Sequence, residues 1–390
     1  MSTPDRPAAV PSAPSVQPAE SQARVRVVLL YGGRSTEHAV SCLSAASAVR
    51  AFDQDHYEVV EVGITRDGSW VLGPAAVPAL TGPGRALPEV DPRGREVALR
   101  AAPGASGRVV VEAAGTAGVL PGGGSVIAAA DVVFPLLHGP FGEDGTVQGL
   151  LALAGVPYVG SGVFASAASM DKIHMKRILT AVGLPVGPWR EVPPELTGAG
   201  LRDLVAPLGL PLFVKPARGG SSVGITRVTD LAGLDAAVAT ARDCDSRVLV
   251  EAAVVGREIE CGVLQFPDLG LRASLPAEVL LGEDLEFYDF EAKYLSDAVG
   301  LAVPAELTAA QTAAVQELSL AAFRALDCAG LARVDFFLTP DGLVVNEVNT
   351  MPGFTPASLF PRMWAASGVA YGELVDVLVR TALVLGPARR

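Results

Sequence analysis

The feature that most constrains the fold is an apolar run at Val25–Tyr31 that ends in Gly32–Gly33. A continuous apolar run closed by glycines predicts a buried strand that enters a tight turn. A helical stretch follows from about residue 35 to residue 52, and Tyr57–Ile64 predicts a second strand. Strand, helix and strand at this spacing predict a parallel βαβ unit, so the chain is expected to begin with a doubly wound α/β domain.

The rest of the chain predicts further domains. A length of 390 residues favours two to three domains, and a half-apolar composition can supply their cores. The Pro- and Gly-rich stretch 73–124 is interpreted as an ornamental hairpin insertion, after which the sheet resumes at Asp131–Leu137. Residues 161–182 predict one long helix, and Arg272–Leu280 predicts one strand. The predicted division is a disordered leader at 1–24, an α/β domain at 25–160, and further units at 161–255 and 256–390.

Charge and composition disfavour several classes of protein. The net charge of −12 argues against a nucleic-acid binder, which would gain affinity by neutralising phosphates. No run of about 18 or more apolar residues occurs, so no transmembrane helix is predicted, and the leader lacks the apolar core of a signal peptide. The four cysteines are scattered without a CxxC pair, which disfavours a disulfide framework or a zinc site and fits a cytoplasmic location.

Lysine is scarce in this chain. Only four of the 30 Lys and Arg residues are lysines: Lys172, Lys176, Lys215 and Lys293. A position that keeps Lys among so many arginines is a candidate for a compact ammonium charge, a group that binds phosphate well. The alternative is that these positions keep lysine by chance, although three of the four lysines lie in the motifs described below.

Lys215 opens a Gly- and Ser-rich segment, KPARGGSSVG at 215–224, between two predicted strands. Glycines allow close approach of the backbone to a ligand, serines add hydroxyl donors, and the lysine adds positive charge. The segment therefore predicts a loop that covers phosphates. It is not a Walker A motif, because the lysine precedes the glycines. An ordinary Gly/Ser hairpin turn is the alternative.

A hairpin late in the chain places acidic side chains on one face. Its turn is Pro-Asp-Gly, and centring the hairpin on Asp341 pairs Asp335 with Glu347 and Arg333 with Asn349. Facing carboxylates repel, and oxygen ligands of this kind suit Mg²⁺ shared with substrate phosphates. The arginine can hold a carboxylate or a developing oxyanion. A bulge would shift the register by one residue, and a solvated polar face is the alternative.

Other polar positions are weaker signals. Glu251 and Glu258 can offer carboxylates to an adenine edge and to ribose hydroxyls, with exposed strand charges as the default alternative. Glu37 lies near a helix N-terminus, where it can bind an ammonium or simply favour the helix dipole. His138, on a Gly-rich loop after a buried strand, is a candidate proton carrier or anion contact, or else a structural histidine.

In their order along the chain these motifs resemble the D-alanine–D-alanine ligases, a family of ATP-grasp enzymes, from about residue 25 to the C-terminus. The matching stretches are YGGRSTEHAVS (31–41), HGPFGEDGTVQG (138–149), PYVGSG (157–162), SMDK (169–172), FVKPARGGSSVG (213–224), FYDFEAKYLSD (287–297), RVDFF (333–337) and NEVNTMPGFTPASLFPRM (346–363). The resemblance implies an N-terminal α/β substrate-binding domain followed by a two-subdomain ATP-grasp fold of α+β type, with ATP between the two subdomains.

The resemblance also implies a nucleotide and metal site. The groups implied for the nucleotide are Lys172, Lys215 and Ser222 at the phosphates, Glu251 and Val254 at adenine, Glu258 at ribose, and Lys293 on a loop that closes over ATP. Two Mg²⁺ (or Mn²⁺) ions are implied at Asp335, Glu347 and Asn349.

The implied substrate groups surround the same nucleotide. Glu37 is implied to bind the ammonium of the first D-alanine, with Tyr294 and Ser221 completing a hydrogen-bonded triad that closes the loop. The remaining implied contacts are His138 and Asn349 at the substrates, Arg333 and the Gly353 backbone at the acyl phosphate and tetrahedral intermediate, and Ser358 and Leu359 at the second D-alanine carboxylate.

The implied activity is the ATP-dependent ligation of two D-alanines through a D-alanyl phosphate. The products are D-alanyl-D-alanine for peptidoglycan precursors, ADP and phosphate. The implied protein is a cytoplasmic homodimer without nucleic-acid or membrane partners. The chain departs from the family pattern at Gly219, where some members carry an acidic residue, and at Ala252, where many carry Lys or another polar residue. We expect these departures to alter nucleotide affinity and to leave the chemistry intact.

Three alternative functions fit the same residues less well. A ligase that uses D-lactate or D-serine as second substrate is the nearest alternative, and Tyr294 argues for D-alanine. Another ATP-grasp ligase would lack the His138 loop and the stretch 347–359. A non-catalytic nucleotide-binding regulator on the same fold would lack metal ligands or phosphate lysines.

Overall fold

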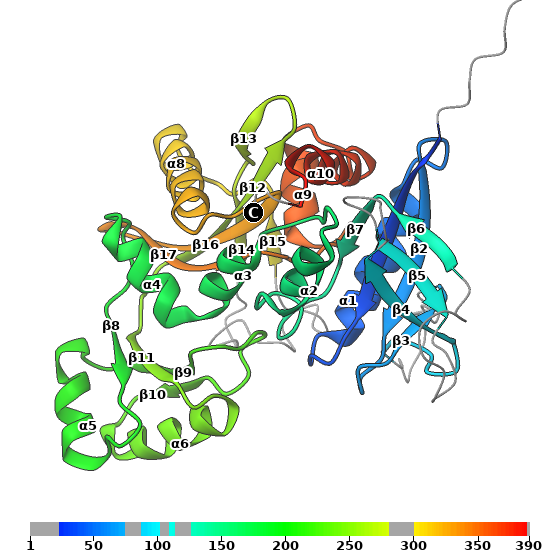
Figure 1. Cartoon of the computed structure of the whole chain (residues 1–390). Helices are drawn as coiled ribbons and strands as arrows, with labels where there is room; N and C mark the ends of the chain where they lie inside the picture. Colours follow the sequence, from blue (N-terminus) through cyan, green and yellow to red (C-terminus); the bar gives the residue numbers. More distant parts are fainter. Residues whose placement is uncertain (1–22, 75–86, 102–108, 114–125, 281–299, 388–390) are drawn as a thin grey trace, which may run out of the picture.

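The computed structural model describes residues 23–74, 87–101, 109–113, 126–280 and 300–387. This part of the chain contains three β-sheets, of seven, four and six strands. Figure 1 shows the seven-stranded sheet with the N-terminal strands on the right, the four-stranded sheet at the lower left, and the six-stranded sheet with the C-terminal helices above and between them. We refer to them as the N-terminal, central and C-terminal sheets.

The N-terminal sheet is built around β1 (Val25–Gly32). This strand pairs in parallel with β2 (Tyr57–Ile64) on one side and with β7 (Val132–Pro135) on the other, and α1 (His38–Ala51) makes the crossover. The predicted parallel βαβ unit is therefore confirmed. Side chains of α2 (Thr146–Ala154) pack on one face of β1 and β7, and side chains of α1 pack on the other. Burial on both faces explains why β1 is a continuous apolar run.

The hairpin predicted within residues 73–124 is confirmed as β4 (Arg95–Ala101) paired with β5 (Val109–Ala113), but it continues the main sheet and is not an ornament beside it. Four strands extend the sheet outward from β2 in the order β6-β5-β4-β3-β2-β1-β7. The edge of β2 would otherwise expose unpaired backbone groups, and the added antiparallel strands cover it. These strands are β3 (Trp70–Leu72), β4 (Arg95–Ala101), β5 (Val109–Ala113) and β6 (Val126–Ala130).

The single helix predicted at 161–182 is also corrected by the structure. It is two helices, α3 (Val163–Met170) and α4 (Lys172–Ala181), separated by Asp171. Asp171 has an extended backbone, with φ −85° and ψ 98°, and its side chain accepts hydrogen bonds from the backbone N–H groups of Ile173 and His174. An aspartate in this position accepts from the unpaired N–H groups at the start of a helix, so a second helix begins after it.

The central sheet is antiparallel, with the strand order β10-β9-β11-β8. Apolar side chains of α5 (Gly198–Val205) and α6 (Leu234–Cys244) pack with those of the strands into one core. The strands are β8 (Trp189–Val192), β9 (Leu212–Pro216), β10 (Thr226–Val228) and β11 (Val248–Ala252).

The C-terminal sheet carries the predicted hairpin and several helices. The predicted strand at Arg272–Leu280 is two strands, with Ser274 between them. The Ser274 backbone N–H donates to the Gly262 carbonyl oxygen at 2.8 Å, and the Ser274 hydroxyl accepts from the Gly262 N–H at 3.0 Å. A capping box between Thr308 and Gln311 begins α8. The elements are β12 (Arg257–Phe266), β13 (Gly270–Ala273), β14 (Ala277–Leu280), β15 (Gly300–Ala302), α8 (Ala309–Ala325), β16 (Leu331–Thr339), β17 (Gly342–Asn349), α9 (Leu359–Ala366) and α10 (Tyr371–Leu385).

The hairpin of β16 and β17 has the predicted pairs by a route that was not predicted. Thr339 pairs with Gly342, so the loop has two residues and would pair Asp335 with Asn346. A bulge at Asn346 adds one residue to β17 and brings Glu347 opposite Asp335. The predicted pairs are confirmed because the shorter turn and the bulge compensate each other.

Helix α10 joins the N-terminal and C-terminal sheets. Its buried side chains Leu374 and Leu378 lie in one core with Leu29 and Phe134 of the N-terminal sheet and Phe266 of the C-terminal sheet. A shared apolar core of this kind holds the two sheets in a fixed relation. Across the described ranges, every helix is too short or too polar to cross a membrane.

Candidate functional site

A cleft of about 1120 Å³ lies where the three sheets approach one another. Its walls include Glu37 from the N-terminal sheet, Lys215 and Glu251 from the central sheet, and Arg333 and Glu347 from the C-terminal sheet. Nearly all the predicted site residues that the structure describes line it: Glu37, His138, Lys172, Lys215, Ser221, Ser222, Glu251, Val254, Glu258, Arg333, Glu347, Asn349, Gly353, Ser358 and Leu359. Asp335 lies directly behind this lining, and Lys293 and Tyr294 fall outside the described residues.

Two lysines from different elements share one buried glutamate. Lys215 Nζ donates to Glu251 Oε2 at 2.8 Å, and Lys176 Nζ lies 3.2 Å from Glu251 Oε1. Burial alone would raise the pKa of the Glu251 carboxyl, but Lys176 and Lys215 outweigh it and lower this pKa to about 2. The carboxylate therefore fixes two ammonium groups in the floor of the cleft.

Lys172 contributes a third cation and contacts the Gly/Ser loop. Its Nζ donates to the carbonyl oxygen of Gly219 at 2.8 Å. Burial lowers the pKa of the Lys172 ammonium, and the nearby charge of Glu347 acts in the opposite direction. A buried cation with a lowered pKa is stabilised by an incoming anion, so this end of the cleft favours a polyanionic ligand.

The Gly/Ser loop has an unusual backbone. Ser221 has φ 49° and Ser222 has φ 59°, both in the left-handed region that disfavours residues with a side chain. These two residues form a tight turn, in which the Val223 N–H donates to the carbonyl oxygen of Gly220 at 3.2 Å. The predicted phosphate-covering loop is consistent with this geometry.

Glu37 is held against this loop. The Ser221 hydroxyl donates to Glu37 Oε1 at 2.5 Å, which is the part of the predicted triad that lies in the described residues. The carboxylate occupies space beside two glycines: a Cβ at Gly139 would lie 2.6 Å, and one at Gly220 would lie 2.8 Å, from Glu37 Oε2. An alanine at either position would therefore require the Glu37 carboxylate to shift.

Arg333 forms ion pairs with two carboxylates at the hairpin, those of Asp335 and Glu260. Its Nε and Nη2 donate to the two carboxylate oxygens of Asp335 at 2.7 Å each, and its Nε lies 3.0 Å from Glu260 Oε2. Burial would lower the pKa of the guanidinium, but Asp335 and Glu260 raise it well above its usual range. The Asn349 amide nitrogen also donates to Asp335, at 3.0 Å. The arginine is thus a permanent, oriented cation.

His138 is fixed in a neutral form. Its Nδ1 lies 3.0 Å from the carbonyl oxygen of Met351, which can only accept, so Nδ1 carries the proton and Nε2 accepts from the Ser44 hydroxyl at 3.1 Å. Burial lowers the pKa of the imidazole, although the charge of Glu37 opposes this. These contacts favour the structural role for His138 over a proton carrier.

A helix N-terminus faces the far end of the cleft. Ser358 is the N-cap of α9, and Ser358 and Leu359 line the cleft. The hydroxyl of Ser358 lies 3.1 Å from where a Cβ on Gly353 would be, so these segments are in close contact. The first N–H groups of a helix favour an anion, which suits the predicted carboxylate site.

Sequence analysis did not assign Glu143, Lys176 or Glu260 to the site. Glu143 accepts from the backbone of Gly139 at 2.8 Å and of Met351 at 3.0 Å, and burial together with the charge of Glu37 raises its pKa to about 8. Lys176 follows Lys172 by four residues, one helical turn, and this spacing was a usable signal. Glu260 could not be found, because its partner Arg333 comes from a strand distant in the sequence.

Comparisons with known proteins now decide the family. Two family models match the chain: "D-ala D-ala ligase N-terminus" over residues 26–161 and "D-ala D-ala ligase C-terminus" over residues 178–380. The chain belongs to the D-alanine–D-alanine ligase family. The predicted family and the predicted multidomain ATP-grasp fold are confirmed by these matches and by the solved structures described next.

Named members of the family are similar along almost the whole chain. A D-alanine–D-alanine ligase from Rhodococcus jostii (strain RHA1) is 54% identical over 370 residues, covering 94% of this chain and 99% of the relative. One from Mycobacterium avium (strain 104) is 54% identical over 372 residues, with the same coverage.

Solved structures of the family share the fold. The D-alanine–D-alanine ligase from Coxiella burnetii has 33% sequence identity and a TM-score of 0.75, covering 92% of this chain and 94% of that one. The VanG D-Ala:D-Ser ligase from Enterococcus faecalis has 32% identity and a TM-score of 0.77, covering 92% and 100%. Since a D-serine ligase matches the fold as well as a D-alanine ligase does, fold alone does not select the second substrate.

Proposed function

We propose that the cleft joins two D-alanine molecules at the expense of ATP and so makes D-alanyl-D-alanine for peptidoglycan precursors. The observation that carries the proposal is the gathering of three unlike charge sites in one cleft. They are a carboxylate for an ammonium at Glu37, lysines for phosphates at Lys172 and Lys215, and a fixed guanidinium at Arg333. The relatives at 54% identity that are named D-alanine–D-alanine ligases support the same activity.

ATP is proposed to lie between the central and C-terminal sheets. Its phosphates would contact Lys172, Lys215 and the Ser222 loop, whose charges and N–H groups suit a polyphosphate. Adenine would lie beside Glu251 and the backbone near Val254, and the ribose hydroxyls beside Glu258, while Lys293 would close over the nucleotide. In this arrangement Glu251 also holds Lys215, so its position links the adenine end to the phosphate end.

Two Mg²⁺ (or Mn²⁺) ions are proposed at Asp335, Glu347 and Asn349. The donors fit hard divalent cations: Glu347 lines the cleft opposite Asp335, and the Asn349 amide nitrogen donates to Asp335, so the amide oxygen is the atom offered to a metal. Arg333 already bonds both oxygens of Asp335, so this ligand would be shared between guanidinium and cation. When bound, the ions would neutralise charge on the transferred phosphate.

The first half of the reaction activates one D-alanine. Glu37 would bind its ammonium and so place its carboxylate toward the γ-phosphate of ATP. Attack by a carboxylate oxygen on the γ-phosphorus gives D-alanyl phosphate and releases ADP. The chain's contribution is positioning and charge neutralisation, chiefly by Glu37, Lys172 and Lys215.

The second half forms the peptide bond. The carboxylate of the second D-alanine would bind at Ser358 and Leu359, at the N-terminus of α9, which leaves its neutral amine to attack the acyl carbon. The oxyanion of the tetrahedral intermediate would be stabilised by Arg333 and the backbone N–H of Gly353. Phosphate then leaves, and the amine loses its proton as the dipeptide forms.

A closing loop, a homodimer and a cytoplasmic location complete the proposal. The triad of Glu37, Ser221 and Tyr294 would close the loop and exclude water from the acyl phosphate. A homodimer and a cytoplasmic location are also proposed, in keeping with the resemblance on which they were predicted.

The proposal is tested by measuring phosphate release by the purified protein with ATP and Mg²⁺, with products identified by mass. D-alanine is compared with mixtures of D-alanine with D-lactate or D-serine, and with L-alanine. Release that depends on D-alanine, with D-alanyl-D-alanine as product, supports the proposal. The similarity to a D-Ala:D-Ser ligase makes D-serine the informative competitor, and a mainly mixed product at neutral pH would replace the proposed second substrate. ATP binding without stimulation by any D-amino acid would point to a regulator.

A further inference from the structure

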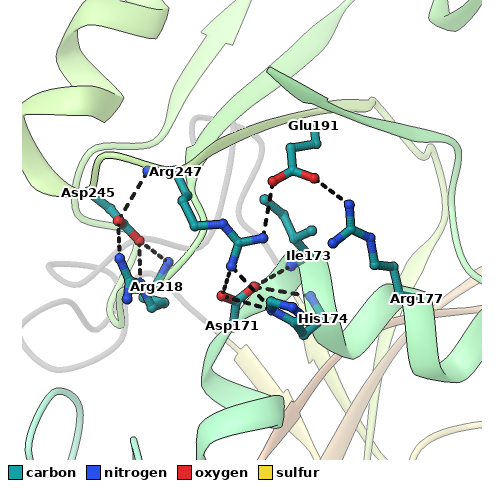
Figure 2. Close-up of polar contacts among 8 residues, drawn as sticks. All are labelled: Asp171, Ile173, His174, Arg177, Glu191, Arg218, Asp245 and Arg247. Carbon is teal, nitrogen blue, oxygen red and sulfur yellow. Dashed lines mark hydrogen bonds and ion pairs between the residues drawn. The ribbon is translucent and has the colours of Figure 1, made fainter. Parts of the chain in front are cut away.

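Two ion pairs, Arg218–Asp245 and Arg247–Asp171, lie behind the cleft wall and are joined by a hydrogen bond from the Arg247 backbone N–H to Asp245 (Figure 2). In the part of the chain that the structure describes, none of these four residues lines the cleft. We propose that this set, called the back-wall network, positions Lys172 and the Gly/Ser loop for ATP, with Arg247 as its organising residue. The inference rests on the proposed function of the cleft as a nucleotide site.

One end of the network fixes Lys172. Asp171 Oδ1 accepts from the backbone N–H groups of Ile173 at 3.1 Å and His174 at 3.0 Å. Asp171 is thus the N-cap of α4, and Lys172 is the first residue of this helix. The backbone N–H of Lys172 donates to Ala217 at 2.9 Å, and its Nζ reaches Gly219. The orientation of Asp171 therefore sets where the Lys172 ammonium enters the cleft.

The other end fixes the start of the Gly/Ser loop. The backbone N–H and Nε of Arg218 each donate to Asp245 Oδ2 at 2.9 Å, and its Nη2 donates to Oδ1 at 2.6 Å. Asp245 Oδ1 also accepts from the backbone N–H of Arg247, at 3.1 Å. The three bonds from Arg218 hold the residue immediately before the loop glycines.

Arg247 joins the two ends. Its Nη1 pairs with Asp171 Oδ2, its Nη2 lies 3.1 Å from Glu191 Oε1, and its carbonyl oxygen accepts from the backbone N–H of Ala217 at 2.8 Å. Figure 2 shows its guanidinium lying between Asp171 and Glu191, with its backbone beside Asp245. The side chains of Asp171 and Arg247 are 8% and 28% exposed, so solvent screens this pair less than it screens a surface pair.

The backbone of the loop explains why such a support is needed. Ser221 and Ser222 have left-handed φ angles, and strained conformations of this kind persist only where the surroundings over-determine them. Without the guanidinium of Arg247, Asp171 would keep its cap bonds and the Lys172 N–H would still donate to Ala217, but the side-chain tie between Asp171 and Arg247 would be lost. Lys172 and the loop would then be held together by backbone contacts alone, and phosphate binding would have to order their side chains again.

The test uses variants that change the charge pair and keep the local fold. Asp171→Asn retains the Oδ1 acceptor that caps α4, because Asn is a good N-cap residue, and removes the charge. Arg247→Met removes the guanidinium, and Arg247→Lys restores its charge without the planar fork. The control is Arg177→Met, since Arg177 pairs with Glu191 in the same group and is bonded to neither Asp171 nor the loop in the described contacts.

Affinity for Mg-ATP is measured by calorimetry, together with KM for ATP, KM for D-alanine, kcat and the melting temperature. We expect Asp171→Asn and Arg247→Met each to weaken ATP binding about tenfold, with KM for D-alanine within about twofold of wild type. The double variant should be no weaker than the worse single variant, because both changes break one interaction. Arg247→Lys should recover part of the loss, and Arg177→Met should remain within about twofold.

Three outcomes overturn the inference: unchanged ATP affinity in Arg247→Met, equal losses for ATP and D-alanine that follow the melting temperature, or additive effects in the double variant. A wild-type protein that binds no ATP would overturn both this inference and the proposed function. Wild-type turnover with an unaffected Arg247→Met variant would overturn the network alone.

Discussion

Two regions of the cleft position their reactive groups in different ways. The hairpin of β16 and β17 holds Arg333, Asp335, Glu347 and Asn349 on adjacent strands, where pairing sets their distances. The enclosing loops, defined as residues 138–145 and 217–224, hold groups that depend on contacts from distant parts of the chain.

The difference is visible in the backbone. Both strands of the hairpin have regular pairing apart from the bulge at Asn346, and the only positive φ in the hairpin is at Gly342 in its turn. The enclosing loops contain Phe141, Ser221 and Ser222 with positive φ. Their positions depend on hydrogen bonds such as that from the Met351 backbone N–H to Glu143 Oε2. The fixed charges of the reaction thus lie on a pleated scaffold, and the parts that enclose the ligands lie on loops supported from outside.

The largest effect is expected on the hairpin. Arg333→Lys keeps a positive charge near Asp335 and Glu260 and loses the planar fork that makes two bonds of 2.7 Å to Asp335. We expect kcat to fall by about 10²- to 10³-fold, the usual cost of one donor to an oxyanion. Steady-state kinetics with D-alanine and ATP measure it.

The matched control for this change is Arg380→Lys, an exposed ion pair with Asp268 that lies outside the cleft. It should leave kcat unchanged. An Arg333→Lys enzyme with more than half the wild-type kcat would remove the oxyanion role from this arginine.

The next effect tests the enclosing loops with two adjacent glycines. A Cβ at Gly220 would lie 2.8 Å from Glu37 Oε2, whereas at Gly219 the nearest atom is Pro216 Cγ at 3.7 Å. Gly220→Ala should displace the Glu37 carboxylate and raise KM for the first D-alanine about tenfold, a loss of roughly 1.4 kcal/mol of binding. Gly219→Ala should change it less than about twofold. Equal effects of the two alanines would show that loop flexibility, and not the space for Glu37, determines binding.

The same difference explains what the sequence could predict. The pairs Asp335–Glu347 and Arg333–Asn349 are local, so strand period and turn position placed them to within one residue. The predicted pairs then held because the bulge compensated the shorter turn. The capping box of α8 is equally local, because Thr308 and Gln311 lie three positions apart.

Contacts between distant segments could not be predicted in this way. The break at Asp171 looked like the interior of a helix, because its partner Arg247 lies 76 positions later, just before β11. Glu260 beside Arg333 depends on the pairing of β12 with β16. The family resemblance supplied the roles of the loop residues, and the structure supplied the partners that hold them.

A smaller effect is expected from Glu143, which ties the loop 138–145 to the Met351 backbone. Its pKa of about 8 in the folded protein lies above the ordinary value of 4.5, so the unfolded chain releases this proton first as pH rises. Wild-type stability should therefore fall between about pH 5 and pH 8, by about 1–2 kcal/mol in total after allowance for its partial exposure.

Glu143→Gln removes this ionisation. Gln has one oxygen for two backbone donors, so it should destabilise the protein at pH 6, and its deficit relative to wild type should shrink by pH 8.5. Denaturant unfolding at the two pH values measures both. Parallel stability changes in wild type and variant would contradict a raised pKa at this site.

The smallest effects come from placing glycine in each region. Ser222 has φ 59°, where a residue with a side chain costs about 1–2 kcal/mol and glycine does not, although glycine also costs about 0.5–1 kcal/mol in chain entropy. Ser222→Gly should therefore raise the free energy of unfolding by about 0.5 kcal/mol. Asn346, at the bulge of β17, does not have a positive φ, so Asn346→Gly should lower the free energy of unfolding by a similar amount. Urea unfolding without ligands compares the two. Changes of the same sign would mean that the loop backbone is no more strained than the hairpin, and the contrast between the two regions would then rest on side-chain contacts alone.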